Sequence, residues 1–154
     1  MKSRCQLVAF YLDDQCYALR LAAVECVFPA AELTMLPDAP SIVEGVINVR
    51  GRIIRAVNIR RRFKLAEREM KLSDQMIVAT TGKRAVALLV DSVIGVIERW
   101  EDEIAPADGI LPGLEYIEGV VKFEDGLILI HDLETFLSLE EGETLERAMA
   151  RMEG

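Results

Sequence analysis

The residues of this chain that have acid–base or nucleophilic chemistry are few, and their spacing does not favour catalysis. His131 is the only histidine, and Asp132 follows it directly in a strand-like segment. Adjacent residues of a strand point to opposite faces, so the Asp132 carboxylate is badly placed to orient the His131 imidazole as a general base. We therefore interpret His131 as a structural residue, and we predict no catalytic residue and no enzymatic activity.

The three cysteines also lack the spacing of a disulfide framework or a metal site. Cys5, Cys16 and Cys26 are odd in number, and no C-x-x-C pair occurs among them. A reactive thiolate needs a nearby cation or a helix N-terminus, and the sequence positions no base beside any of the three. The glycines match neither of the common phosphate-loop patterns. We predict buried, reduced thiols, no bound metal and no cofactor.

Seven cations are concentrated in fifteen residues: Arg50, Arg52, Arg55, Arg60, Arg61, Arg62 and Lys64. Arginine binds phosphate through bidentate hydrogen bonds, so a nucleic-acid-binding tandem β-barrel that uses the Arg50 to Lys64 cluster is one hypothesis. The net charge of -8 counts against this hypothesis. The cluster also contains a single aromatic residue, Phe63, whereas proteins that bind single strands stack bases on several. We favour a solvated charged face or a protein-binding patch, and predict no nucleic-acid partner.

The length and composition indicate a globular protein. A chain of 154 residues fits one domain or two closely packed half-domains. Half of the residues are apolar, but the longest apolar runs are far shorter than the roughly 20 residues of a membrane span. The first residues lack the small-residue cleavage site of a secretory signal. We expect a cytoplasmic protein without direct membrane insertion, and a monomer when isolated.

The two halves of the chain resemble each other. Three pairs of segments match in order: residues 6–24 with 75–93, 42–49 with 116–123, and 57–59 with 131–133. Self-similarity of this kind indicates two related structural units, of about residues 4–63 and 74–138. The charged segment 64–74 connects them, and an exchange of strands between the units is left open.

Each unit has the pattern of short strands. Runs of five to seven β-branched and aromatic residues are separated by turn pairs at Asp13-Asp14, Arg50-Gly51, Gly82-Lys83 and Asp125-Gly126. Many short strands favour small closed barrels, because closure removes exposed sheet edges. We predict an all-β (mainly β) fold of two small five-stranded barrels packed side by side.

Helices are predicted only at the ends of the units. Asn58 and Asp132 each precede a short apolar stretch, 59–63 and 133–137, and their side chains suit the N-terminus of a short helix. The segment 139–154 begins within a capping box, Ser138 to Glu141, and carries apolar residues at helical spacing. We expect it to form an acidic amphipathic C-terminal helix.

The sequence resembles the CheW-like family of chemotaxis coupling proteins. The run Gly45-Val-Ile-Asn-Val-Arg-Gly-Arg-Ile-Ile-Arg-Ala-Val-Asn-Ile-Arg60 is similar to the family signature G-V-x-N-L-R-G-x-x-x-P-x-x-D-L-R. Leu88 to Val93 resembles the element G-x-x-V-D-x-V, and residues 119–133 resemble the closing segment of the family. The resemblance covers about residues 4 to 138, in order.

This resemblance implies two SH3-like barrels and a non-catalytic scaffold. In the family, the scaffold couples the cytoplasmic domain of a chemoreceptor to the regulatory domain of a CheA-type histidine kinase. The resemblance therefore implies recruitment to membrane-associated receptor arrays. It also implies a set of partner-binding residues: Arg50 in the N-L-R-G element, Gly45 and Asn48 in the same signature, and Val24, Cys26 and Phe28 on the strand after the first small helix.

The sequence departs from the family pattern at three positions. Arg55 stands where proline is usual, Asn58 where aspartate is usual, and Cys26 where a polar residue is often found. Asn58 still suits a helix cap but lacks the negative charge that favours a helix N-terminus by ~0.3 to 1 kcal/mol. Arg55 adds a cation near Arg50, which favours a more acidic partner surface.

Overall fold

The computed structural model describes residues 3–36, 43–60, 65–66, 68–82, 84–107 and 116–136. The predicted C-terminal helix at 139–154 lies outside these residues. Of the predicted helix at 59–63, only residues 59 and 60 are described, and they form a turn. The rest of the described chain is dominated by strands, in agreement with the all-β prediction.

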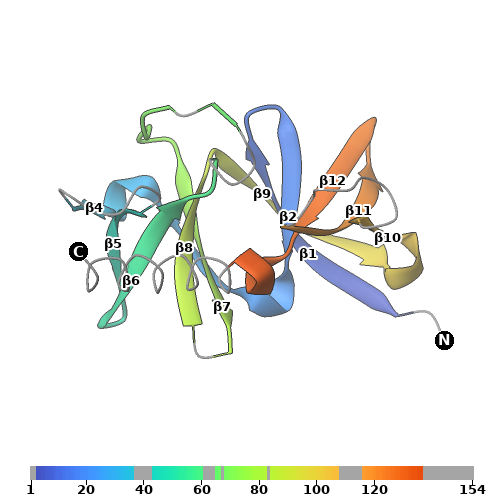
Figure 1. The fold of residues 1–154 in the computed structure, drawn as a ribbon, viewed down its shortest axis with the longest axis horizontal. Helices are drawn as coiled ribbons and strands as arrows, with labels where there is room; N and C mark the ends of the chain where they lie inside the picture. Colours follow the sequence, from blue (N-terminus) through green and yellow to red (C-terminus); the bar gives the residue numbers. More distant parts are fainter. Residues whose placement is uncertain are drawn as a thin grey trace, which may run out of the picture.

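The strands form two sheets, here called the first and the second barrel (Figure 1). The first barrel has the order β10 (Ala105–Pro106), β11 (Ile117–Phe123), β12 (Gly126–His131), β2 (Gln15–Arg20), β1 (Arg4–Leu12) and β9 (Ser92–Trp100). The second has the order β3 (Val24–Pro29), β7 (Gln75–Thr81), β8 (Arg84–Val90), β6 (Arg52–Asn58), β5 (Val43–Val49) and β4 (Thr34–Met35). Among the described residues, three short 3-10 helices lie between strands: Leu21–Ala23, Ala30–Glu32 and Glu101–Glu103.

The two barrels repeat one topology and exchange a hairpin. The β1–β2 hairpin comes from the first half of the chain but pairs with strands of the second half, and the β7–β8 hairpin does the reverse. Parallel pairs close each exchange, β12 with β2 and β6 with β8, while the other pairs are antiparallel. The prediction of two SH3-like barrels is confirmed, with β4 and β10 as an additional two-residue strand in each sheet.

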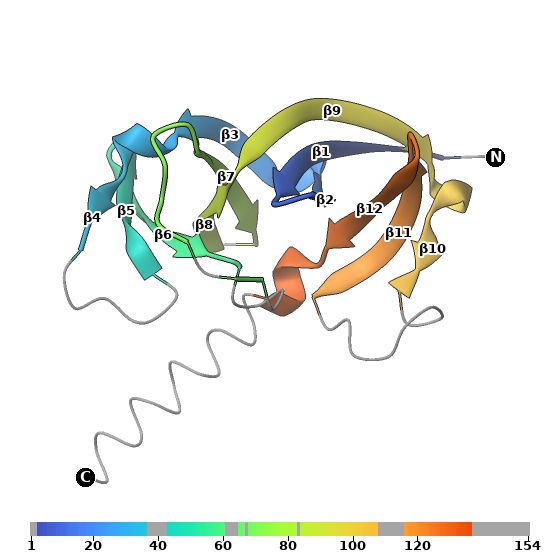
Figure 2. The same ribbon diagram turned by 90° about the horizontal axis from the view of Figure 1, so that it is seen from above.

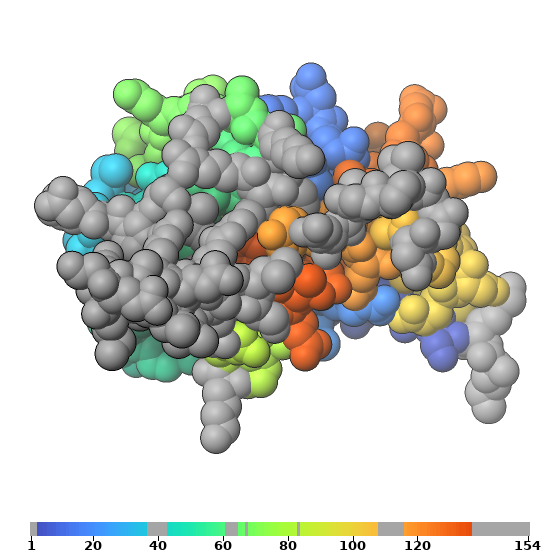
Figure 3. All heavy atoms as spheres, in the orientation of Figure 1, coloured from blue at the N-terminus to red at the C-terminus, as the bar shows by residue number. Residues whose placement is uncertain are grey.

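The barrels lie side by side along the long axis of the molecule. Figure 3 shows side chains of β4–β6 at one end and those of β10 and β11 at the other. Two apolar clusters fill the barrels separately, and a third contains buried residues from both, including Phe10 and Leu12 of β1 and Leu88 of β8. Each fully buried aliphatic or aromatic side chain contributes roughly 1.5–3 kcal/mol. This shared core holds the two barrels together.

The hairpins turn where the sequence predicts, with one shift. The loops are the two-residue connections after Leu12, Val49 and Thr81, as expected. The fourth loop is Glu124-Asp125, one residue earlier than predicted, because Gly126 already pairs with Phe123. Glu124 takes the positive φ of 50° there without a glycine.

Asp132 caps the short helix at residues 133–136, as predicted. Its Oδ1 accepts a hydrogen bond from the Thr135 amide at 3.1 Å, and its Oδ2 accepts one from the Thr135 hydroxyl at 2.7 Å. The carboxylate therefore satisfies an amide that the helix itself leaves open. None of the helices in the described part of the chain has the length and hydropathy to cross a membrane.

Candidate partner-binding site

The β5–β6 hairpin presents Arg50 at the tip of a tight turn. Val49 pairs with Arg52, so the loop consists of Arg50 and Gly51, which have φ values of 51° and 86°. Two successive positive φ angles are the mark of a turn that follows the natural twist of a hairpin. The Asn48 Oδ1 accepts a hydrogen bond from the Gly51 amide at 2.8 Å and stabilises the turn. The exposed Arg50 side chain is therefore carried by a rigid support.

This turn lies beside β3. The Arg52 guanidinium donates to the Glu25 carboxylate at 2.5 Å, which joins the hairpin to the strand. Burial raises the pKa of the Cys26 thiol and Glu25 raises it further, while the charges of Arg50 and Arg52 lower it. The structure thus brings Arg50, Asn48 and Cys26 into one region, and their contact with a partner stays a prediction. Arg52 and Glu25 belong to this region but were not predicted.

The two faces of β3 differ in burial. Residues alternate between half-buried and exposed along the strand. The half-buried residues pack on the apolar clusters and are the three that the resemblance selects: Val24, Cys26 and Phe28. The exposed residues are the other three: Glu25, Val27 and Pro29. Partner contact by the half-buried set stays a prediction, and the outward set offers the larger accessible surface.

Gly45 is buried in β5, at a position that requires glycine. A Cβ atom at this position would lie 2.2 Å from the backbone oxygen of Thr34 in β4. The absence of a side chain therefore allows β4 to approach β5. Gly45 offers no side chain to a partner, and any contact it makes would be indirect.

The outward face of β9 is apolar at its centre. Ile94 and Val96 are 43% and 54% exposed there, and the polar residues Ser92 and Glu98 lie on either side of them on the same face. On β3, Val27 is 38% exposed. Figure 2 shows β3 and β9 along the same side of the molecule, one over each barrel. The Val93 amide of β9 donates to the Gln75 Oε1 of β7 at 2.7 Å, and β7 pairs with β3.

Sequence reasoning did not identify this β9 surface, although a signal for it exists. The segment Ser92 to Ile97 lacks the alternation of polar and apolar residues that a strand with one solvated face shows. Both β3 and β9 are edge strands of their sheets. An edge strand that exposes neighbouring aliphatic residues is a candidate surface for association with another chain.

The one histidine of the chain and two of its three thiols are buried, while Cys26 is half-buried. His131 is 3% exposed and packs against Phe136, and burial lowers its pKa to about 4, so the imidazole is neutral at physiological pH. Burial raises the pKa of the Cys16 thiol to about 11 and also raises that of Cys5. In the described part of the chain, no group of three His, Cys, Asp or Glu side chains is arranged so that it could hold a metal ion.

Arg60 does not belong to a solvated basic face. Its side chain is 5% exposed and forms ion pairs with Asp13 at 2.8 Å and with Asp91 at 2.6 Å. An arginine at the end of β6 can be buried because the carboxylates of two distant segments meet it there. Arg61, Arg62 and Lys64 lie outside the described residues. The basic cluster is therefore partly neutralised within the protein.

The sequence matches the family model for the CheW-like domain over residues 6–141. The chain belongs to this family. It is 31% identical to the chemotaxis protein CheW of Rhizobium meliloti, over 90% of this chain and 90% of that protein. It is also 31% identical to the chemotaxis protein CheW of Thermotoga maritima, over 86% and 87% of the two chains.

A solved CheW structure has the same fold. The scaffolding protein TtCheW from Thermoanaerobacter tengcongensis superposes with a TM-score of 0.76 at 29% identity, covering 85% of this chain and 90% of that one. The CheW-like family consists of non-catalytic scaffolds, and this member is a chemotaxis coupling scaffold.

Proposed function

We propose that this protein couples the cytoplasmic tips of chemoreceptors to a CheA-type histidine kinase through two separate surfaces. The observation that carries the receptor surface is the exposure of aliphatic residues on two edge strands, Val27 on β3 and both Ile94 and Val96 on β9. The strands lie along the same side of the molecule. A helical hairpin with an apolar face fits such a surface.

Charges beside β3 make the proposed receptor surface selective. Arg50 stands on the rigid hairpin turn, and Arg52 forms an ion pair with Glu25 next to it. An arginine offers several donors in a fixed fork, so Arg50 would bind acceptors on a receptor helix while the aliphatic residues bury its apolar face. Of the predicted partner residues, Arg50 and Cys26 lie at one boundary of this surface, and Asn48 contributes indirectly by stabilising the Arg50 turn.

The proposed kinase surface is the outer face of the β5–β6 hairpin. Ile53 is 68% exposed there, and its cross-strand partner is Asn48. Ile53 points away from the barrel interior, because Ile54 and Ala56 face the core. A similar barrel from the kinase would cover this aliphatic residue. Recruitment of the complex to receptor arrays at the membrane follows from the receptor contact.

The nucleic-acid hypothesis has less support. Of the four described arginines of the basic cluster, Arg52 and Arg60 already form ion pairs with carboxylates of this chain. Binding of phosphate would have to compete with these pairs, against a net charge of -8.

Calorimetric titration with a receptor tip fragment tests the receptor surface. Arg50→Ala and Val96→Ser should each weaken binding by about 2 kcal/mol, which corresponds to about thirty-fold. Lys122→Ala removes one exposed cation from β11 and should leave the affinity unchanged. Equal weakening by Arg50→Ala and Lys122→Ala that disappears at high salt would show diffuse electrostatics instead of a specific site.

The same titration with a kinase regulatory domain tests the other surface. Ile53→Ser should weaken kinase binding by about 2 kcal/mol and leave receptor binding unchanged. Loss of both interactions in a folded Ile53→Ser variant would contradict the separation of the two surfaces.

A further inference from the structure

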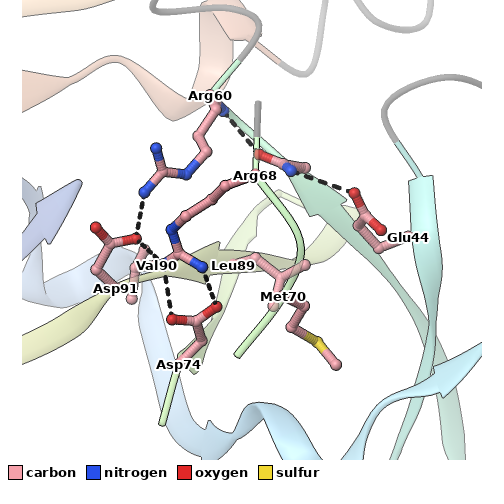
Figure 4. Close-up of a pocket in the computed structure, with 9 residues that line it drawn as sticks. Glu44, Arg60, Arg68, Met70, Asp74, Leu89, Val90 and Asp91 are labelled. Carbon is pink, nitrogen blue, oxygen red and sulfur yellow. Dashed lines mark hydrogen bonds and ion pairs between the residues drawn. The ribbon is translucent and has the colours of Figure 1, made fainter. Parts of the chain in front are cut away.

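Five charged residues meet at the junction of the two barrels, and we call this group the clasp: Asp13, Arg60, Arg68, Asp74 and Asp91. Arg60 is the most deeply buried cation of the clasp. Its Nη1 donates to the Asp13 Oδ1 in the β1–β2 turn at 2.8 Å, and its Nη2 donates to the Asp91 Oδ1 at 2.6 Å. Figure 4 shows the Arg60 and Arg68 guanidinium groups converging on Asp91. Because Arg60 follows β6, its pair with Asp13 joins the second barrel to the first.

Asp91 is the residue on which the clasp depends. It stands between β8 of the second barrel and β9 of the first, where the chain passes from one sheet to the other. Its Oδ1 accepts hydrogen bonds from Arg60 and Arg68, each at 2.6 Å, and its Oδ2 accepts one from the Asp13 amide at 2.7 Å. Its own amide donates to the Tyr11 oxygen of β1 at 3.0 Å. One side chain therefore receives donors from three other segments.

Arg68 extends the clasp to the end of β3. Its guanidinium forms a bidentate pair with Asp74, at 2.9 and 2.8 Å, in addition to its bond with Asp91. The Asp74 backbone oxygen accepts a hydrogen bond from the Ala30 amide at 2.9 Å, directly after β3. The clasp thus touches the start of β9 through Asp91 and the end of β3 through Asp74.

We propose that Asp91 is a positioning residue that fixes the angle between the two barrels, so that β3 and β9 present one continuous surface. The part of this proposal that concerns receptor binding rests on the proposed function. The part that concerns the angle between the barrels does not depend on it. A buried cation that loses one of its partners is left with an uncompensated charge, and in some proteins buried ionic groups specify one arrangement among several. Packed elements can slide past one another by small amounts, and the ion pairs of the clasp would oppose such sliding at this junction.

The geometry is tested by measuring the distance between the barrels. Spin labels at Glu32→Cys and Lys122→Cys, both exposed and on different barrels, report it by pulsed electron resonance in a Cys26→Ser background. Burial raises the pKa values of the Cys5 and Cys16 thiols, so these two label slowly. In Asp91→Asn the distance distribution should shift, or at least double in width.

Glu118→Gln is the matched control. It also removes one carboxylate from an arginine pair, with Arg20, but both residues belong to the first barrel. Its distance distribution should equal that of the wild type. If Asp91→Asn does not fold, the milder Arg68→Gln should give the same broadening. An unchanged distribution in a folded Asp91→Asn or Arg68→Gln variant would overturn the proposal.

A binding experiment tests the consequence for function. Asp91→Asn should lower the affinity for the receptor tip fragment at least fivefold. The affinity for the kinase regulatory domain should stay within twofold of the wild-type value, because the proposed kinase surface lies on one barrel alone. If Asp91 only stabilises the fold, the substitution should weaken both interactions or neither. Either result would overturn the positioning role. If the wild type binds no receptor fragment, the proposed function fails, while the distance measurement still decides the role of the clasp.

Discussion

Addition of one methyl group at Gly45 should destabilise the protein far more than the same addition at Gly119. The two glycines occupy equivalent places, because β5 pairs with β4 at Gly45 and β11 pairs with β10 at Gly119. Both are buried. Their surroundings differ in what a new Cβ would meet, and this difference sets the expected magnitudes.

At Gly45 the obstacle is backbone. The new Cβ would lie 2.2 Å from the Thr34 oxygen and 2.9 Å from its carbonyl carbon, so β4 has to separate from β5. At Gly119 the nearest atom is the Cγ2 methyl of Ile104 at 2.6 Å, a side-chain atom that a change of the Ile104 χ1 angle can move, followed by the Ala105 oxygen at 3.1 Å. Overpacking costs about 1–3 kcal/mol, and replacing glycine by alanine recovers about 0.4–1 kcal/mol from the unfolded state. We expect losses of about 2 kcal/mol for Gly45→Ala and below about 1 kcal/mol for Gly119→Ala.

Urea unfolding of the wild type and both variants measures these losses as changes in the free energy of unfolding. Because Gly45 is buried, folded Gly45→Ala protein should still bind a receptor fragment with wild-type affinity. Equal losses at the two sites would refute the reasoning from backbone contact. A stable Gly45→Ala variant that no longer binds the receptor would instead give Gly45 a direct part in the interface.

Three further predictions concern side chains. His131 has a folded pKa of about 4 against an ordinary value of 6.5, so the folded state binds fewer protons and stability falls as the pH drops from about 6.5 to 4. His131→Leu should remove up to about 3 kcal/mol of this pH dependence, measured by urea unfolding across that range; an unchanged dependence would contradict the cause. Asn48→Ala should lose about 1 kcal/mol of unfolding free energy, because the turn amide loses its acceptor, and a neutral result would show that the turn needs no cap. In thiol labelling at neutral pH, Cys26 should react at least about tenfold faster than the buried Cys5 and Cys16, and rapid reaction of Cys16 would contradict its burial.

The fold could be predicted because its signals are local or repeated. The similarity between residues 6–24 and 75–93 predicted two related units, and the strand patterns and turn pairs predicted barrels. The turn pairs also located three of the four hairpin turns and missed the fourth by one residue. The exchange of the β1–β2 and β7–β8 hairpins was left open, since either arrangement buries the same apolar faces and only long-range pairing distinguishes them.

The site was less predictable, because its geometry depends on contacts between distant segments. The Arg50 turn follows from the local Asn48-to-Gly51 sequence, and the resemblance pointed to it. The ion pairs of Arg52 with Glu25 and of Arg60 with Asp91 join residues that nothing in the sequence connects. Arg60 therefore looked like part of a basic cluster, although its charge is buried and neutralised.

Simultaneous binding of both partners tests the central claim, that this chain is a scaffold with two separate surfaces. The chain is first saturated with a kinase regulatory domain, and a receptor tip fragment is then titrated into the complex and followed by calorimetry and analytical ultracentrifugation. We predict a ternary complex of one copy of each partner, with a receptor affinity within about threefold of that of the free chain. Displacement of the kinase domain by the receptor fragment would show that the partners share one surface and would contradict the account.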